Sequence, residues 1–371
     1  MSAVVDEKVV FERSGPLAVA RLNTEKSLNA LSLDMINLLL PQLRAWQTDA
    51  SVKVVWLEGA GQRAFCAGGD VVSLHGSSVD VEGRHRLAED FFTREYTLDH
   101  LLYHYGKPLI CWAEGVVMGG GIGLMAGCSH RIGTPTSRIA MPEITIGLYP
   151  DVGGSRFLSR MPGDLGLFLG LTGASINASD AHYVGLIDHL LDGAAREPLK
   201  QTLAQLNYDP DPRKADAQVS RLLRQQSLPL SDWPTENLRP RFDVINHLCD
   251  ADTLPEVVHN ICSHSGDDDW LARAAQTLAT GSPLSAWLAW VAQQQAAGKS
   301  LADVFRMEWA LSVNCVLKGD LREGVRALLV DKDKTPHFQH QRVEDVDEAL
   351  VASFFELPTS ITSHPLAELG G

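Results

Sequence analysis

The chain has 371 residues, with 32 lysines and arginines against 46 aspartates and glutamates, so its formal net charge is −14. This acidic balance argues against a general nucleic-acid binder, whose surface is expected to carry a basic field. Hydrophobic residues make up 45% and charged residues 21%, which excludes an intrinsically disordered chain.

The cysteines and the N-terminus indicate a cytoplasmic protein. The 6 cysteines are scattered and form no Cys-x-x-Cys pair, so we expect reduced thiols. The first 15 residues are charged and lack an apolar stretch, so we expect neither a signal peptide nor a transit peptide. No uncharged apolar run reaches about 18 residues, so we expect no membrane span.

Strands and helices are predicted to alternate over the first 190 residues. Ser32 suits a helix N-cap, and apolar residues at helical spacing follow it to about Trp46, so we expect a helix there, kinked at Pro41. The other predicted elements are strands at 8–13, 17–22, 53–58, 109–114, 138–141 and 186–190 and helices at 87–104, 165–171 and 178–183.

The composition changes after about residue 206. Residues 207–216 are rich in Asp and Pro and are the best linker candidate. The sequence that follows them is rich in Leu, Ala and Gln. An amphipathic helix is predicted at 301–316. We therefore expect an α/β core at 1–206 and a mainly helical region at 207–371.

Two glycine-rich loops follow predicted strands, at residues 64–70 and 118–123. Glycines in such places let the backbone approach a ligand and present N–H groups to it. Two such loops together favour an oxyanion hole for a thioester or ester carbonyl. On spacing alone, the alternative that these glycines only form tight turns is about equally good.

The second loop also imitates a dinucleotide-binding fingerprint. Residues 121–126 fit Gly-x-Gly-x-x-Gly/Ala, and Glu143 lies 20 residues after Gly123. This interpretation leaves the first glycine loop unexplained, and no second βα repeat follows Glu143. The dinucleotide reading is therefore the weaker one.

Residues 141–154 place two carboxylates, Glu143 and Asp151, in an apolar loop shaped by Gly and Pro. Apolar neighbours desolvate a carboxylate, which favours a raised pKa and acid–base or nucleophilic use. The alternative is structural: Asp151 caps the following helix, and Glu143 pairs with Arg138 or Arg156.

No metal site is expected. The His-x-Cys pair at 247–249 and the Cys-x-His pair at 262–264 are spaced too closely for usual zinc ligands. Asp267, Asp268 and Asp269 resemble a solvated helix start. There is no Gly-x-Ser-x-Gly elbow and no P-loop.

Taken in order, these motifs resemble the crotonase (enoyl-CoA hydratase/isomerase) superfamily. The resemblance includes Leu-Asn and Leu-Asn-Ala-Leu within 22–31, Phe-Cys-Ala-Gly-Gly-Asp at 65–70 and Met-Gly-Gly-Gly at 118–121. It implies a superhelix of ββα units extended by C-terminal helices that complete an acyl-CoA site. It further implies a small-molecule acyl-CoA partner, no nucleic-acid or membrane partner, and a possible homo-oligomer.

Within the superfamily the chain looks most like the 3-hydroxyisobutyryl-CoA hydrolases. Phe-Phe-Thr-Arg-Glu-Tyr at 91–96, the long loop at 141–154 and Glu-Gly-Val-Arg-Ala-Leu-Leu-Val-Asp-Lys-Asp at 323–333 are similar to their signatures. Hydratases of the superfamily carry a second glutamate where this chain has Gly123. Because adding water across a double bond needs two acid–base groups, the resemblance favours thioester hydrolysis.

The resemblance also implies roles for individual residues. The N–H groups of Gly69 and Gly120 would form the oxyanion hole, with Gly68 beside the substrate. Glu143 would be the nucleophile or the general base, and Asp151 would donate a proton or orient water.

Four further residues are implied in substrate binding. Glu95 would bind substrate or support Asp151, unless it is an exposed helix carboxylate. Lys26, Arg63 and Lys332 would meet the CoA phosphates. No cofactor is implied, since CoA belongs to the substrate. Two other functions stay open, an enoyl-CoA hydratase or isomerase and a non-catalytic acyl-CoA-binding protein.

Overall fold

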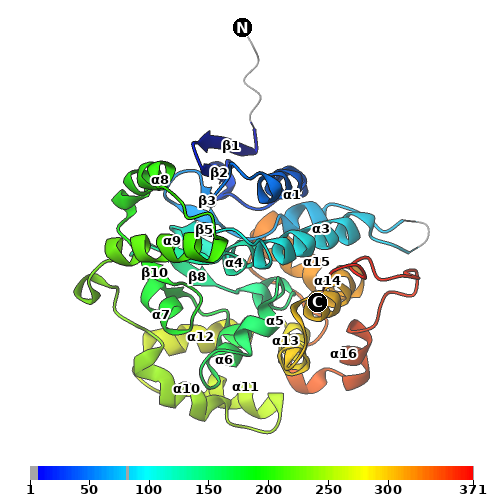
Figure 1. The fold of residues 1–371 in the computed structure, drawn as a ribbon. Coiled ribbons are helices and arrows are strands. Elements are labelled where there is room, and N and C mark those ends of the chain that lie inside the picture. Colours follow the sequence, from blue (N-terminus) through cyan, green and yellow to red (C-terminus); the bar gives the residue numbers. More distant parts are fainter. Residues whose placement is uncertain (1–6, 81–82, 371) are drawn as a thin grey trace. The chain divides into compact units, whose positions relative to one another are not determined.

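The computed structural model describes residues 7–80 and 83–370 (Figure 1). A six-stranded sheet has the order β1-β2-β3-β5-β7-β10, in which β1 and β2 are antiparallel and every later neighbour is parallel. Its strands are β1 (Val9–Ser14), β2 (Leu17–Leu22), β3 (Val54–Gly59), β5 (Leu109–Ala113), β7 (His130–Gly133) and β10 (His189–Leu190).

A four-stranded sheet has the order β4-β6-β8-β9. Its strands are β4 (Ala64–Cys66), β6 (Val116–Met118), β8 (Arg138–Ala140) and β9 (Ile176–Asn177). Successive strands alternate between the two sheets, since β3, β5 and β7 enter the larger sheet while β4, β6 and β8 enter the smaller one. Helices follow β4 and β6, so the chain is built from repeated ββα units.

Helices make up most of the remaining structure. In the first half they are α1 (Leu33–Thr48), α2 (Val71–His75), α3 (Arg86–Tyr103), α4 (Gly120–Ala126), α5 (Gly154–Leu158), α6 (Leu165–Thr172) and α7 (Ala178–Tyr183). In the second half they are α8 (Arg196–Gln205), α9 (Pro212–Gln226), α10 (Phe242–Cys249), α11 (Leu254–Ser263), α12 (Asp269–Thr280), α13 (Pro283–Ala296), α14 (Leu301–Lys318), α15 (Leu321–Val325) and α16 (Glu348–Phe354).

The predicted start of α1 is correct, and the predicted linker at 207–216 is partly wrong. Ser32 Oγ accepts a hydrogen bond from Met35 N at 3.3 Å, and α1 continues through Pro41 to Thr48. The linker prediction for 207–216 is wrong in its second half, where α9 begins. Asp211 caps α9 and Pro212 occupies its first turn, which is a helix-start pattern that the polar composition obscured.

The chain forms two compact units, each assembled from separated segments. The sheet unit comprises residues 7–69, 98–139 and 176–236, and it holds both sheets apart from the last residue of β8. The helical unit comprises residues 70–80, 83–97, 140–175 and 237–370. The sequence-based boundary at residue 206 stays a prediction.

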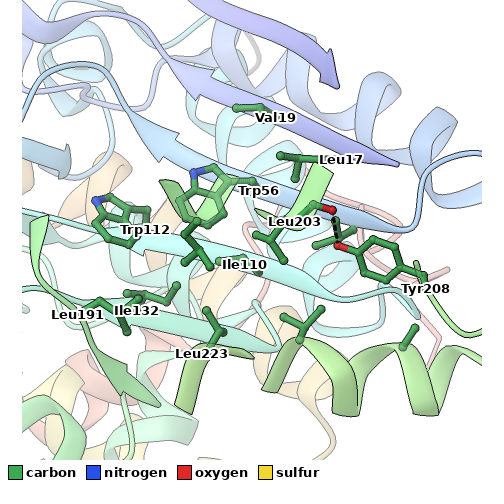
Figure 2. Packing of buried hydrophobic residues seen from close by; sticks show 14 residues of the cluster. Leu17, Val19, Trp56, Ile110, Trp112, Ile132, Leu191, Leu203, Tyr208 and Leu223 are labelled. Carbon is green, nitrogen blue, oxygen red and sulfur yellow. Dashed lines mark hydrogen bonds between the residues drawn. The ribbon is translucent and has the colours of Figure 1, made fainter. Parts of the chain in front are cut away.

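Two stacked tryptophans belong to the buried core of the sheet unit (Figure 2). The rings of Trp56 on β3 and Trp112 on β5 lie 5.5 Å apart at an interplanar angle of 21°. Leu203 of α8 and Leu223 of α9 belong to the same buried cluster. Segments on both sides of residue 206 therefore bury apolar surface against the six-stranded sheet, which is the main source of its stability.

Candidate active site

The two glycine loops lie side by side in the sheet unit. They start at the paired strands β4 and β6, where Cys66 is opposite Val117. A Cβ atom added at Gly121 would lie 2.3 Å from the carbonyl oxygen of Cys66, so only glycine permits this approach. Gly68 has a φ of +112°, and a Cβ there would lie 3.5 Å from the carbonyl oxygen of Met118.

The two predicted oxyanion-hole residues occupy these loops. Gly69 is half-buried and forms a parallel bridge with Leu31. Gly120 is buried and is the first residue of α4. An N–H group in the first turn of a helix has no carbonyl partner within that helix, so it is available to an external acceptor.

Glu143 is a buried carboxylate in the helical unit. It begins the short 3-10 helix Glu143–Ile146 and its exposed fraction is 4%. Burial, and then the charge of Asp151, raise the pKa of Glu143 well above its ordinary value. Within the described ranges, Glu143 Oε2 accepts no hydrogen bond, and Glu143 forms no ion pair with an arginine.

Asp151 is the second buried carboxylate of the same loop. Its Oδ2 atom accepts a 2.7 Å hydrogen bond from the hydroxyl of Tyr96 on α3. Burial raises the pKa of Asp151 to about 6, against the opposing effect of the Tyr96 hydrogen bond. Two desolvated carboxylates that interact electrostatically are an arrangement suited to acid–base or nucleophilic chemistry.

Asp151 does not cap the following helix. The N-cap of α5 is Gly153, whose φ is +83°. A glycine has no side chain that could accept a hydrogen bond from the helix. Glu308 of α14 receives the N–H of Gly153 at 2.7 Å and that of Ser155 at 3.1 Å. The structural alternative for Asp151 is therefore wrong, and another carboxylate performs that task.

Glu308 was missed by the sequence reading. It is fully buried, and burial raises its pKa to about 8 while the backbone donors oppose that shift. The sequence does contain a signal for its burial. Glu308 is a charged residue on a helix face where Val304, Phe305 and Leu311 are apolar. A lone carboxylate on the apolar face of a helix indicates a buried polar contact.

Glu95 lies on the buried side of α3. Its exposed fraction is 2%, so the alternative of an exposed helix carboxylate is wrong. Glu95 raises the pKa of the neighbouring Tyr96, although burial is the larger cause of that shift. It thus belongs to the same buried polar region of the helical unit as the Tyr96–Asp151 pair.

The three predicted phosphate-binding cations are all exposed. Lys26 lies in the 3-10 helix Glu25–Ser27 of the sheet unit. Arg63 precedes β4, and its carbonyl oxygen accepts from Val116 N at 3.0 Å, so it borders the first glycine loop. Lys332 follows residues 326–330 in the helical unit and has a φ of +59°.

The described part of the chain holds neither a metal-binding cluster nor a helix suited to cross a membrane. No group of three or more His, Cys, Asp or Glu side chains within residues 7–80 and 83–370 is arranged to hold a metal ion. Among the helices of the same ranges, none combines the length and the apolar character that a membrane crossing needs.

Comparisons with known proteins agree on the family. A model of the enoyl-CoA hydratase/isomerase family matches residues 17–355. The chain is 36% identical over 356 residues to the mitochondrial 3-hydroxyisobutyryl-CoA hydrolase of Danio rerio, covering 96% of this chain and 91% of that one. It is 32% identical to the protein of the same name from Homo sapiens, covering 94% and 89%.

Solved structures share the fold. An enoyl-CoA hydratase from Rhodobacter sphaeroides 2.4.1 matches with a TM-score of 0.83 at 32% identity, covering 95% of this chain and 98% of that one. A carnitinyl-CoA dehydratase from Mycobacterium thermoresistibile matches with a TM-score of 0.84 at 33% identity, covering 95% and 97%. The expected crotonase-like α/β fold is confirmed, and the chain belongs to the enoyl-CoA hydratase/isomerase family.

Proposed function

We propose that this protein hydrolyses the CoA thioester of a short 3-hydroxyacyl group, of the 3-hydroxyisobutyryl type, to the free acid and CoA. The observation that carries the proposal is the pair of buried carboxylates, Glu143 and Asp151, in a chain of an acyl-CoA family. Relatives named 3-hydroxyisobutyryl-CoA hydrolase, which match more than nine-tenths of the chain, support the choice of substrate.

The chemistry starts at the thioester carbonyl. The N–H groups of Gly69 and Gly120 donate to its oxygen and stabilise the negative charge that forms there. Glu143 attacks the carbonyl carbon, or removes a proton from the water that does so, and the carbon–sulfur bond breaks. The CoA thiolate leaves and takes up a proton, and the elements of water complete the acid. The reaction needs no cofactor beyond the CoA of the substrate.

Asp151 assists the reacting groups. With a pKa of about 6 and a hydrogen bond from Tyr96, it is mostly ionised at neutral pH. In that state it orients water or the substrate hydroxyl by accepting a hydrogen bond. In its protonated fraction it donates its proton to the leaving thiolate, and the proton that the attacking water loses restores it. Buried Glu95 supports this polar region or binds the substrate directly.

One assay tests the proposal against its alternatives. Purified protein is incubated with 3-hydroxyisobutyryl-CoA and, separately, with crotonyl-CoA, while free thiol and enoyl absorbance are recorded. Thiol release that disappears in Glu143→Ala supports hydrolysis. Enoyl loss without thiol release would instead support a hydratase, and binding without either change would support an acyl-CoA-binding protein.

A hydratase is the second candidate because a solved structure at 32% identity is that of an enoyl-CoA hydratase. Gly123 argues against it, since this chain lacks a carboxylate where family hydratases carry their second glutamate. The crotonyl-CoA arm of the assay decides between the two.

An isotope experiment separates the two roles of Glu143. In a single turnover in water labelled with ¹⁸O, a general base delivers the label directly to the product acid. A nucleophile forms an anhydride, and water attack on its enzyme-side carbonyl places the label in Glu143. Peptide mass spectrometry of the active-site segment reads this difference.

A further inference from the structure

The buried face of α14 carries two polar residues one helical turn apart, Glu308 and Ser312, both fully buried. Residues four positions apart lie on the same face of a helix. Burying a carboxylate and a hydroxyl is unfavourable unless hydrogen bonds compensate for the lost water. The hydrogen-bond partners of these two residues therefore show which part of the structure this face of α14 supports.

Glu308 holds the main chain directly after Asp151. Its two oxygens receive the N–H groups of Gly153 and Ser155, at 2.7 and 3.1 Å. Between Asp151 and Gly153 lies Val152, whose φ of +53° is in the left-handed region that β-branched residues avoid. Such a conformation persists only where surrounding contacts enforce it, and Glu308 provides two of them.

Ser312 acts on the side chain of Asp151 through Tyr96. The Tyr96 hydroxyl lies 2.7 Å from Asp151 Oδ2 and 2.7 Å from Ser312 Oγ. Because its single hydrogen is donated to the carboxylate, Ser312 must donate to Tyr96. Ser312, Tyr96 and Asp151 thus form a short chain of hydrogen bonds that strengthen one another. Tyr149 donates to the Glu308 carbonyl oxygen at 2.8 Å, and its hydroxyl oxygen lies 3.0 Å from Ser312 Oγ.

We propose that Glu308 and Ser312 are positioning residues for Asp151, with Glu308 fixing the turn that carries it and Ser312 orienting the phenol that bonds its carboxylate. This inference rests on the proposed function, because it assumes that Asp151 takes part in thioester hydrolysis. It gives the buried face of α14 a specific task in that reaction.

The first variant is Glu308→Gln. A glutamine keeps one carbonyl oxygen for one of the two N–H groups and presents its amide hydrogens to the other, so one contact to the turn is lost. Small displacements of a reacting group reduce turnover strongly, so we expect kcat to fall roughly 10- to 100-fold. We expect KM for the acyl-CoA to stay within about 3-fold, since the binding groups are unchanged.

The second variant, Ser312→Ala, keeps the Tyr96–Asp151 hydrogen bond and removes the donor behind it. We expect a smaller fall in kcat, and we expect the acidic limb of the pH profile to move to higher pH. The groups that interact electrostatically with Asp151 are Glu143, Glu308, Tyr96, Tyr149 and Cys315. The variant changes the hydrogen bonding of Tyr96 and Tyr149 and leaves the side chains of the other three groups unaltered, so a shift of the limb reports on the hydroxyl groups around Ser312.

Asp268→Asn is the matched control. Asp268 Oδ1 accepts the N–H groups of Trp270 and Leu271 at 3.0 and 3.1 Å, at the start of α12 in the same unit, and its Oδ2 accepts from Arg241 at 2.6 Å. It thus anchors two backbone N–H groups as Glu308 does, without bonding residues 151–155. Asparagine also caps helices well, so this variant should retain wild-type kcat and pH profile.

The outcomes are separable. If the wild-type protein releases no thiol from 3-hydroxyisobutyryl-CoA, the proposed function itself is wrong. With an active wild type, a folded Glu308→Gln protein with unchanged kcat overturns the role of Glu308, and an unmoved pH limb in Ser312→Ala overturns that of Ser312. If Glu308→Gln does not fold, Glu308→Asp takes its place, because it keeps the charge and withdraws the carboxylate from the turn; unchanged kcat in that variant overturns the role of Glu308.

Discussion

The hydroxyl of Tyr96 donates a 2.7 Å hydrogen bond to Asp151 across 55 residues of sequence. Both side chains are buried, so the bond stabilises the ionised carboxylate in a place where burial opposes ionisation. The pairing links the Phe-Phe-x-x-Glu-Tyr segment on α3 to the loop that carries both carboxylates. Each of the two sequence signatures contains one partner of the bond.

Replacing this phenol should shift the pH dependence of hydrolysis. In Tyr96→Phe, Asp151 loses the bond that lowers its pKa, so its carboxylate is protonated at a higher pH. If activity needs the ionised form, the acidic limb of kcat/KM moves upward from about pH 6. Tyr105→Phe is the control, because the Tyr105 hydroxyl donates at the same 2.7 Å to the Leu43 carbonyl oxygen instead. An unmoved limb in Tyr96→Phe would contradict the assignment.

Removing the charge of Glu143 should separate activity from stability. We expect Glu143→Gln to lower kcat about 10²- to 10⁴-fold, the range for an acid–base group. The folded state raises the pKa of Glu143, so ionisation above the unfolded value of roughly 4.3 destabilises the fold at neutral pH. Glu143→Gln should therefore melt at a higher temperature at pH 7, measured by calorimetry. A lower melting temperature would show that the carboxylate stabilises the fold.

The contact between the two glycine loops can be tested with one methyl group. In Gly121→Ala the new Cβ would lie 2.3 Å from the Cys66 carbonyl oxygen, so the loops must move apart. Because oxyanion stabilisation depends on donor geometry, we expect kcat to fall at least 10-fold with little change in substrate Kd. In Gly83→Ala nothing lies within 4 Å of the added Cβ, although its φ of +75° is strained; this control should keep its kcat. Equal kcat values for wild type and Gly121→Ala would count against the oxyanion hole.

The exposed cations should affect substrate binding and leave chemistry unchanged. We expect Lys26→Glu, Arg63→Glu and Lys332→Glu each to raise KM several-fold, with the effect shrinking at high salt because exposed charges are screened. Lys214→Glu, an exposed position on α9, serves as the charge-matched control. If the charge reversal at one of the three cations changes KM no more than Lys214→Glu does, that cation does not contact a phosphate.

A buried ion cluster in the sheet unit predicts a stability effect without a catalytic one. Glu58 accepts from Lys200 at 3.1 Å and from Arg21 at 2.8 Å. Lys200→Met leaves the Glu58 charge with one cation, which should destabilise the unit by roughly 3 kcal/mol, as expected for a broken buried pair. Chemical denaturation measures the change, and kcat at 25 °C should stay as in wild type.

The same cluster predicts the direction in which the stability of the fold changes with pH. The pKa of Glu58 is lowered in the folded state, with burial opposing and the bonds to Arg21 and Lys200 favouring the charged form. Its contribution to stability is therefore present above the ordinary glutamate pKa and is lost as the pH falls through the lowered value. A melting temperature of the wild type that rises on acidification through this range would contradict the role of Glu58.

Sequence reasoning found the residues whose signals are local. Ser32 was recognised as an N-cap because its partner is three residues away, and Glu143 and Asp151 were recognised because they share one apolar loop. The apolar neighbours of Glu308 in α14 indicate that it is buried, but its partners lie 155 and 153 residues away and no local pattern identifies them. The sequence shows Tyr96 only as part of the Phe-Phe-x-x-Glu-Tyr motif, since its bond to Asp151 becomes visible only in the fold.

The long separation between Gly153 and Glu308 has a consequence during synthesis. The loop with Glu143 and Asp151 leaves the ribosome about 155 residues before the carboxylate that anchors it. Until α14 is made, the N–H groups of Gly153 and Ser155 lack their acceptor and Tyr96 lacks Ser312. A nascent chain therefore lacks the contacts that hold the Asp151 turn until α14 has been made.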